Sequence, residues 1–314
     1  WPTYRADAYR SGYTGEALPE DLSLRWTYHS RHAPQPAWSG RDTRMPFDRA
    51  YQPVVAGGTV FFGSSADCKV YALDAATGEE RWSFFTDGPV RFAPAVWQDR
   101  VFAVSDDGCL YCLSAADGKL VWKVCGGPMD SMILGNDRMI SRWPARGGPA
   151  VADGVVYWAA GIWPSEGIYL YAVEAASGKV LWCNDTAGGL SMPQPHPTAF
   201  ARSGVSAQGD LLVVGDKLLV PTGRAVPAAF RRNDGEFLYF HLQQFRGTGG
   251  SSVVATDTDF LSRGFLFDLA TGTQARKLAA VPETTAVTPG RFVFATAQAV
   301  LAVDRANLWT RKET

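Results

Sequence analysis

A repeated segment constrains the fold of this chain more than any other feature of its 314 residues. Three stretches align with little adjustment: VYALDAATGEERW (Val70–Trp82), LYCLSAADGKLVW (Leu110–Trp122) and LYAVEAASGKVLW (Leu170–Trp182). Each ends in a turn glycine and a tryptophan, and these pairs recur 40 and then 60 residues apart: Gly78 with Trp82, Gly118 with Trp122, and Gly178 with Trp182. Self-similarity of this kind indicates a repeat fold in which each unit is one small supersecondary structure.

Each copy is preceded by a predicted pair of short apolar strands, at Gln52–Gly63, Ala93–Ser105 and Gly148–Gly161. The unit therefore has four strands with alternating hydrophobicity and glycine-containing turns. About 40 residues per four-stranded antiparallel unit is typical of a β-propeller blade. Weaker copies follow at Leu218–Tyr239, Phe265–Gly272 and Val300–Asp304, with Tyr239 and then Arg276 in the place of the tryptophan. We predict an all-β propeller with about six visible blades.

The predicted organisation is one propeller over residues 1–314. A lead-in with a closing strand and a loop covers residues 1–50, and the blades are assigned to 51–90, 91–130, 147–186, 205–245, 250–280 and a shortened 283–314. The repeat glycines are expected to take a positive φ in the turn between the third and outermost strands, because glycine does so without steric cost. The closing aromatics, Trp26, Trp82, Trp122 and Trp182, are large enough to wedge between neighbouring sheets, so we expect them to be structural.

The three strong copies resemble the pyrroloquinoline quinone (PQQ) type of propeller repeat, whose signature ends in A-x-T-G-x-x-x-W. The opening WPTYRADAYRSG is similar to the start of bacterial PQQ-binding-like repeat proteins, and so is GNDRMISRWPARGGP followed by AAGIWPSEGIYLYA. The resemblance covers most of residues 1–240 and implies a quinoprotein-like propeller, with eight blades in the best-known members. It does not by itself imply a bound quinone, since such families include scaffolds such as the propeller lipoprotein of the outer-membrane barrel-assembly machine.

Ring closure leaves two alternatives. Leu24–Tyr28 (LRWTY) resembles an outermost strand with Trp26 in the repeat position. It either completes the sixth blade, so that the ring closes at six, or belongs to a further blade whose inner strands are missing. We favour the second alternative, a part of a seven- or eight-bladed ring, because the resemblance implies more than six blades.

The longest departures from the repeat period fall on one predicted face. They are Ser30–Ala50, Gly126–Arg146, Trp163–Gly167 and Asn184–Gly204. All lie between blades or between the second and third strands of a blade, which open on the face opposite the tight glycine turns. Because loops on a rigid scaffold often carry binding residues, we predict the binding face here. The candidate ligand- or partner-binding residues are Arg142, Trp143, Arg146, Trp163, Glu166, His196 and Arg224.

Arginine and tryptophan together suit a small anionic or planar ligand, or a protein partner, through bidentate hydrogen bonds and stacking. The structural alternative is that these arginines pair with loop carbonyls and acids and hold the inserts together. The sequence leaves both open.

A quinoprotein dehydrogenase, as the resemblance implies, would need Ca²⁺ held by Glu, Asn and Asp oxygens, a catalytic Asp and a disulfide between adjacent cysteines. This chain has no Cys-Cys pair, and its five cysteines argue against a disulfide framework. Cys109 and Cys112 lie an odd number of positions apart on a predicted strand and so face opposite sides, which argues against a zinc site. We assign no catalytic residue, metal or cofactor, and keep PQQ with Ca²⁺ as an alternative.

Charge and hydropathy exclude two classes of partner. The net charge of −1 is wrong for a chain that coats nucleic acid or an anionic membrane. The longest uncharged apolar stretch, Gly154–Trp163, is about half of what a membrane-spanning helix needs, so no transmembrane segment is predicted. The compartment is undetermined from the residues; a periplasmic or exported location is suggested by the resemblance alone.

The predicted function is a non-catalytic propeller scaffold that binds through its insert-bearing face. The alternatives are a PQQ-dependent oxidoreductase resembling alcohol or sugar dehydrogenases, and the non-catalytic propeller part of a larger enzyme.

Overall fold

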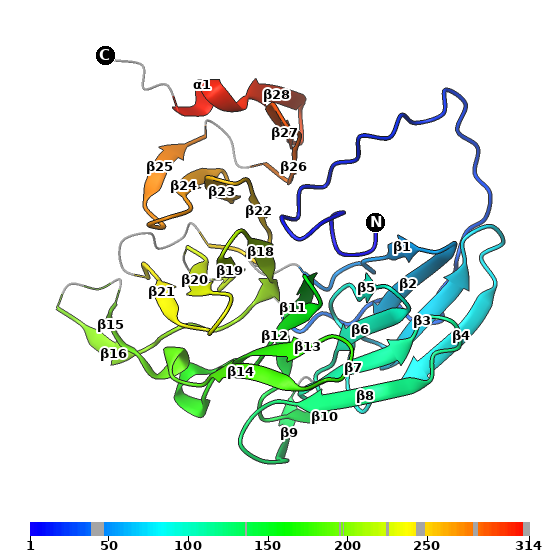
Figure 1. Ribbon diagram of the computed structural model, residues 1–314, viewed down its shortest axis with the longest axis horizontal. Coiled ribbons are helices and arrows are strands. Elements are labelled where there is room, and N and C mark those ends of the chain that lie inside the picture. The colour runs from blue at the N-terminus through cyan, green and yellow to red at the C-terminus, as the bar shows by residue number, and fades with distance from the viewer. Residues whose placement is uncertain are drawn as a thin grey trace.

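The computed structural model describes residues 1–38, 47–135, 137–194, 196, 198–223, 226–242, 249–278 and 282–309. Within them, six sheets of three to five strands follow one another around a central axis in chain order, with two separate hairpins between them (Figure 1). The predicted all-β fold of four-stranded antiparallel blades is confirmed. No helix in the described part of the chain is long and apolar enough to cross a membrane.

The first two sheets have four strands each. Sheet 1 contains β1 (Val54–Ala56), β2 (Thr59–Ser64), β3 (Lys69–Asp74) and β4 (Glu80–Phe85). Sheet 2 contains β5 (Ala95–Trp97), β6 (Arg100–Val104), β7 (Cys109–Ser114) and β8 (Leu120–Cys125). A separate hairpin of β9 (Met132–Gly135) and β10 (Arg138–Ser141) follows.

Sheet 3 has an additional strand on its inner edge. It contains β11 (Ala145–Ala152), β12 (Val155–Ala160), β13 (Tyr169–Glu174) and β14 (Val180–Asn184), with β17 (Gly209–Asp210) paired in parallel to β11. Its inserts are the short 3₁₀ helices η1 (Pro164–Glu166) and η2 (Ala187–Gly189), and a hairpin of β15 (Ser191–Pro193) and β16 (Phe200–Arg202).

The last three sheets complete the series. Sheet 4 contains β18 (Leu212–Val214), β19 (Lys217–Val220), β20 (Ala228–Arg231) and β21 (Phe237–Tyr239). Sheet 5 contains β22 (Val253–Ala255), β23 (Asp259–Ser262), β24 (Phe265–Asp268) and β25 (Gln274–Lys277). Sheet 6 has three strands, β26 (Thr284–Val287), β27 (Arg291–Ala295) and β28 (Val300–Asp304), followed by α1 (Arg305–Trp309).

Most of the hydrophobic core is divided into clusters that each lie between two successive sheets. Phe61 of sheet 1 and Tyr111 of sheet 2 belong to one cluster, and Phe102 of sheet 2 shares the next with Trp158 of sheet 3. Alternation along each strand places one set of apolar side chains on each side of the sheet, so each blade packs against both of its neighbours.

Sheets 1 to 4 are also each fastened to the next sheet through an aromatic side chain on or next to the outermost strand. The indole Nε1 of Trp82 donates to the carbonyl of Ala115 at 3.0 Å, and the indole covers Gly118 in the turn of the next blade. A Cβ on Gly118, whose φ is +70°, would lie 2.6 Å from Trp82 Cε3. Equivalent bonds join sheets 2 to 3, 3 to 4 and 4 to 5: Trp122 to Ala175, Trp182 to Arg232, and Tyr239 to Leu269.

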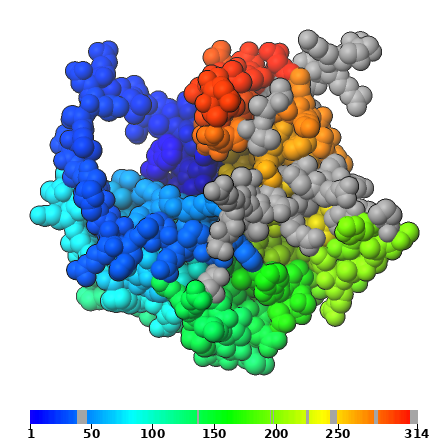
Figure 2. Space-filling view, turned by 180° about the vertical axis from the view of Figure 1, so that it is seen from behind, coloured from blue at the N-terminus to red at the C-terminus, as the bar shows by residue number. Residues whose placement is uncertain are grey.

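Residues 24–28 form no strand, but Trp26 makes the same two contacts with sheet 1 that Trp82 makes with sheet 2. Its Nε1 donates to the carbonyl of Ala75 at 3.1 Å, and its ring covers Gly78. Trp26 thus lies against sheet 1 in the position that an outer-strand aromatic of a preceding blade would have. The chain reaches this point through an extended arch that leaves the body of the molecule (Figure 2).

The first eleven residues run across the centre of the ring, an arrangement that the repeat pattern did not predict. Backbone N–H groups on the innermost strands of five sheets donate to carbonyls of this lead-in: Val55 to Trp1, Val96 to Pro2, Val213 to Ala8, Ala255 to Tyr9, and Val287 to Ser11. The buried Arg10 reaches sheet 3 by donating to the carbonyl of Pro149 at 3.0 Å. Each of these donors lies on the first strand of its blade, close to the turn that leads to the second strand. The lead-in therefore covers the centre of the face that carries the tight turns.

A disulfide joins Cys109 of β7 to Cys125 of β8, with a Cα–Cα distance of 4.0 Å. The sequence argued against a disulfide framework, and the structure has one bridge that this argument did not predict. An odd count of cysteines does not preclude one pair, and these two residues are directly opposite each other in the β7–β8 register. Cys68, Cys112 and Cys183 are free.

Candidate functional site

The insert-bearing face holds three features: a buried ion-pair network, an exposed ion pair, and an apolar cleft. All are built from connections between blades or between the second and third strands of a blade. The face with the tight turns has none of these inserts.

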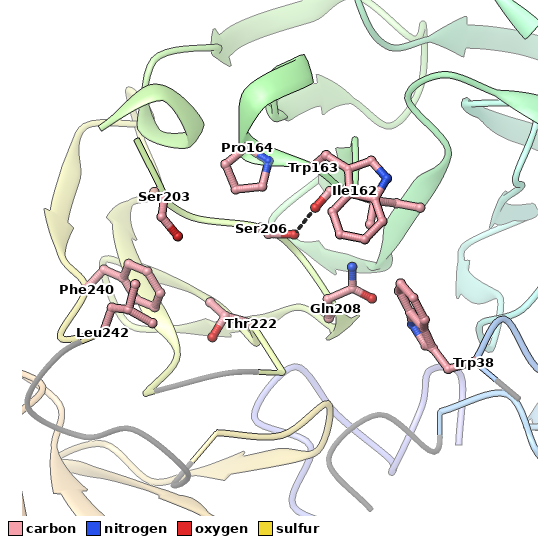
Figure 3. Close-up of a pocket in the computed structure, with 11 residues that line it drawn as sticks. Trp38, Ile162, Trp163, Pro164, Ser203, Ser206, Gln208, Thr222, Phe240 and Leu242 are labelled. Atoms are coloured by element: carbon pink, nitrogen blue, oxygen red, sulfur yellow. Dashed lines mark hydrogen bonds between the residues drawn. The ribbon is translucent and has the colours of Figure 1, made fainter. Parts of the chain in front are cut away.

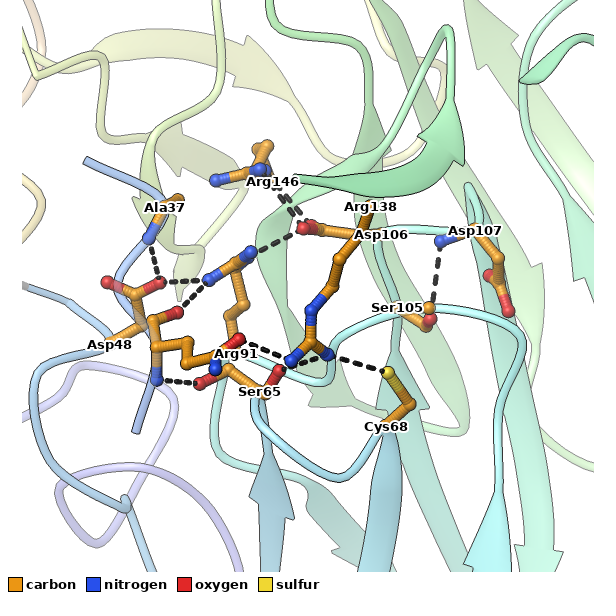
Figure 4. A network of polar contacts seen from close by, with 12 residues as sticks. Ala37, Asp48, Ser65, Cys68, Arg91, Ser105, Asp106, Asp107, Arg138 and Arg146 are labelled. Atoms are coloured by element: carbon orange, nitrogen blue, oxygen red, sulfur yellow. Dashed lines mark hydrogen bonds and ion pairs between the residues drawn. The ribbon is translucent and has the colours of Figure 1, made fainter. Parts of the chain in front are cut away.

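The ion-pair network joins Asp48, which precedes β1, to sheets 2 and 3 (Figure 4). Arg91, in the connection from β4 to β5, donates to Asp48 Oδ2 and to Asp106 Oδ2, each at 2.6 Å. Arg146, on β11, donates to the same oxygen of Asp106 at 3.1 Å. The side chains of all four residues are almost completely buried.

Burial affects the two arginines of this network differently. Burial lowers the pKa of Arg91, but Asp106 and Asp48 outweigh it, so the pKa of Arg91 is raised. Arg146 shares the negative charge of Asp106 with Arg91. This attraction does not offset burial, so the pKa of Arg146 is lowered. Its Nη1 has no hydrogen-bond partner among the described residues. Arg146 is thus a buried structural cation, and Asp106 is the residue that both arginines depend on.

The second feature is an exposed ion pair between β10 and η1. Arg142 Nε donates to Glu166 Oε2 at 2.6 Å. The indole of Trp143 is buried beside this pair and donates to the backbone carbonyl of Glu166 at 2.7 Å. Trp143 therefore positions η1, while the Arg142 and Glu166 side chains remain accessible.

The third feature is a cleft of about 140 Å³ between sheets 3 and 4 (Figure 3). Trp38 and Trp163 form its aromatic end, with ring centroids 6.1 Å apart in an edge-to-face arrangement. Phe240 and Leu242 line the other end, and Gln208 lies between. All eleven lining residues are uncharged: Trp38, Ile162, Trp163, Pro164, Ser203, Gly204, Ser206, Gln208, Thr222, Phe240 and Leu242.

The predicted site residues do not form one cluster. Arg142, Trp143 and Glu166 lie together, Arg146 belongs to the ion-pair network, and Trp163 lines the cleft. His196 is exposed in the connection between β15 and β16. Arg224 lies outside the described residues.

Sequence reasoning missed Trp38, Gln208, Arg91 and the role of Asp106. Trp38, like Trp163, stands outside the repeat, and that was an available signal. Arg91 interrupts the apolar run Pro89–Pro94, which also marks a buried charge. Asp106 lies in the short connection between β6 and β7, and no sequence pattern indicated that its carboxylate forms ion pairs with Arg91 and Arg146. No local pattern marks Gln208.

The described residues do not fit the quinone and Ca²⁺ that the resemblance implies for dehydrogenases. A quinone with several carboxylates requires cations, whereas the cleft is lined by uncharged residues. The buried carboxylates of Asp48 and Asp106 are engaged by arginines. Within the described ranges, no three His, Cys, Asp or Glu side chains come together as metal ligands.

Comparison with known proteins confirms the resemblance to PQQ-type repeats. Residues 23–142 match the family described as outer membrane protein assembly factor BamB. The dehydrogenase subunit of the quinone alcohol dehydrogenase of Gluconobacter oxydans is 32% identical over 143 residues, which cover 41% of this chain and 18% of the relative. Tetrathionate hydrolase of Acidithiobacillus ferrooxidans is 27% identical over 113 residues, or 36% of this chain and 19% of the relative. The matches thus span less than a fifth of these curated relatives.

A solved structure gives the same fold. Quinohemoprotein alcohol dehydrogenase from Comamonas testosteroni superimposes with a TM-score of 0.63 at 18% identity, over 94% of this chain and 57% of that one. The chain therefore has the β-propeller fold of this structure. Relatives and neighbours of this type include both dehydrogenases and an assembly factor, so the fold leaves the activity open.

Proposed function

We propose that this chain is a non-catalytic propeller that binds a partner through its insert-bearing face. The observation that carries the proposal is the difference between the two faces. One has short turns and is covered at its centre by the lead-in, whereas the other carries both extra hairpins, η1 and the cleft.

The inserts present apolar side chains to solvent. Leu134 on β9, Met139 on β10 and Phe200 on β16 are each more than half exposed. Exposed apolar groups next to polar ones are typical of protein interaction surfaces. Among the predicted residues, Trp163, Arg142, Glu166 and His196 are accessible for contact, and we propose the same role for Arg224. The buried Arg146 and Trp143 act by positioning the inserts.

The alternative, a PQQ-dependent oxidoreductase, is tested by adding the cofactor. The purified chain is titrated with pyrroloquinoline quinone in Ca²⁺, and dye reduction is followed with primary alcohols and sugars. A quinoprotein alcohol dehydrogenase serves as the positive control. We expect neither saturable quinone binding nor turnover, because the described lining of the cleft supplies no cation for the quinone and no carboxylate for Ca²⁺. Saturable binding with turnover would overturn the proposal.

We also propose that the protein works in an oxidising compartment, because disulfides such as Cys109–Cys125 persist there. Alkylation of the denatured protein, purified without reductant, should modify the three free cysteines. Modification of all five cysteines would contradict this proposal.

A further inference from the structure

Two buried polar atoms of the cleft have no partner. Gln208 is 4% exposed, yet its Oε1 accepts no hydrogen bond, and the buried Nε1 of Trp38 donates none, in the part of the chain that the structure describes. A buried polar atom without a partner costs about 1–3 kcal/mol. Both residues line the same cleft, and Figure 3 shows the Gln208 amide between the two indoles. A ligand that satisfies both atoms would remove this penalty.

The two unpartnered atoms are one hydrogen-bond acceptor and one donor. A peptide backbone carries both a donor and an acceptor, so it can bond to both atoms. A backbone N–H donates to Gln208 Oε1, and a backbone carbonyl accepts from Trp38 Nε1. Among the described residues the lining is uncharged, which disfavours a charged ligand group, because none of these residues would compensate its desolvation. The volume, about 140 Å³, is well below the roughly 300–1,000 Å³ of typical small-molecule pockets. The cleft therefore suits one or two residues of a longer segment.

The aromatic side chains that line the cleft indicate which kind of peptide segment it binds. Trp163 is 52% exposed and meets Trp38 edge to face, and Pro164 continues the wall. Grooves lined by aromatic side chains bind proline-containing segments in the polyproline II conformation. Such segments have no internal hydrogen bonds, so their carbonyls are free to accept from an indole.

We propose that the cleft binds an extended, uncharged, proline-containing segment of a partner protein. A prolyl ring packs on Trp163, a carbonyl accepts from Trp38 Nε1, and the N–H of a non-prolyl residue donates to Gln208 Oε1. The proposal rests on the proposed function and specifies the class of partner.

The test uses a fluorescein-labelled capped peptide, acetyl-Pro-Leu-Pro-Pro-Leu-Pro-amide, and a comparison peptide with alanine in place of every proline. Binding to the full chain is measured by fluorescence anisotropy. The variants are Trp163→Ala, which removes the exposed wall, and Gln208→Met, which removes the acceptor at similar size. Phe85→Ala is the control, because Phe85 is an exposed aromatic on β4, outside the cleft.

The prolyl peptide should bind, and each cleft variant should raise its Kd about tenfold, the effect of one good interfacial contact. The control should leave Kd within about twofold. Gln208→Met should unfold at or above the wild-type temperature, because it removes a buried unpartnered acceptor.

Three results would overturn the cleft assignment: no binding of the prolyl peptide, equal binding of both peptides, or unchanged Kd in both cleft variants. Photo-crosslinking of a partner to β9 and β16 separates this assignment from the proposed function. If the peptide fails but those crosslinks form, the cleft assignment is wrong and the proposed function stands. If both fail, both are wrong.

Discussion

At the scale of single residues, burial decides which arginines are available for binding. Arg91 and Arg146 are almost completely inaccessible and share Asp106, whereas Arg142 remains in water with Glu166. Arginines that look equivalent in the inserts thus have different roles. A buried ion pair is costly to break, because the remaining charge has neither water nor a partner.

We expect Asp106→Asn to lower the free energy of unfolding by about 3–5 kcal/mol, because it leaves two buried guanidinium groups undercompensated. Arg142→Gln breaks an exposed pair and should cost less than about 1 kcal/mol. Urea denaturation of both variants measures the difference. Equal losses would mean that the network around Asp106 is not a buried determinant of stability.

Asp210 is the second buried charge of interest. It lies on β17 beside the lead-in, and its Oδ1 has no partner among the residues described. Burial raises the pKa of Asp210 from 3.8 to about 6, although Arg10 and Arg5 lower it. A carboxyl with a raised pKa favours the folded state when protonated. This contribution is complete below about pH 4 and is lost as the pH rises through about 6.

Asp210→Asn removes this titration. Between pH 4.5 and 7.5 the wild-type protein should lose about 2 kcal/mol of stability relative to the variant, because at 1.36 kcal/mol per pKa unit about 1 kcal/mol of the full effect of about 3 kcal/mol is already lost at pH 4.5. Denaturant titrations at the two pH values give this difference. Asp99→Asn, at an exposed carboxylate, is the control and should change it little. A difference of zero for Asp210→Asn would show that this carboxyl is not buried as described.

At the scale of elements, the interlock of an aromatic with the next blade's glycine turn defines the repeat. Gly118 needs a positive φ and also lies under Trp82, so two separate reasons exclude a side chain. Gly57 has a positive φ of +55° but open space around it. The two positions therefore separate the backbone effect from the packing effect.

Gly57→Ala should cost only the left-handed backbone penalty of roughly 1–2 kcal/mol. Gly118→Ala should cost a further 1–3 kcal/mol or so, because its Cβ would overlap the indole of Trp82. Differential scanning calorimetry of the two variants compares them. If both unfold at the same temperature, the indole does not constrain the turn.

These elements could be predicted because their signals are local. The turn, its glycine and the tryptophan lie within one short segment, and the segment recurs. The lead-in and the network could not be predicted, because their partners are far apart in sequence. Arg10 and Pro149 are 139 positions apart, and Arg91 and Asp48 are 43. The cleft likewise combines Trp38 with Gln208, which no periodicity relates.

At the scale of the whole molecule, the lead-in connects the sheets to one another. It receives hydrogen bonds from the inner strands of five sheets, and Arg10 adds the sixth. Arg10 also donates to the carbonyls of Leu211 and Tyr4. A local change at Arg10 should therefore act on all sheets together.

Arg10→Met should increase hydrogen exchange in peptides that cover β1, β5, β18, β22 and β26 alike, because the lead-in loosens as a unit. Arg25→Met, at an exposed position of the arch, is the matched control and should leave exchange unchanged. Exchange that rises only near β11 would contradict a role for the lead-in in joining the ring.

The two faces of the ring have different structural roles. The lead-in and the tight turns close one face, and the inserts on the other are free for a partner. A crosslinking experiment can test this division between the faces before the partner is identified.

Site-specific photo-crosslinking provides the most direct test. Benzoylphenylalanine is placed at Leu134 and Phe200 on the inserts, and at Thr77 and Ser177 in the tight turns, all four of which are exposed. The variants are irradiated in extract of the source cells. We predict the same crosslinked partner from both insert positions and none from the turn positions. A partner captured from the turns and not from the inserts would contradict the account.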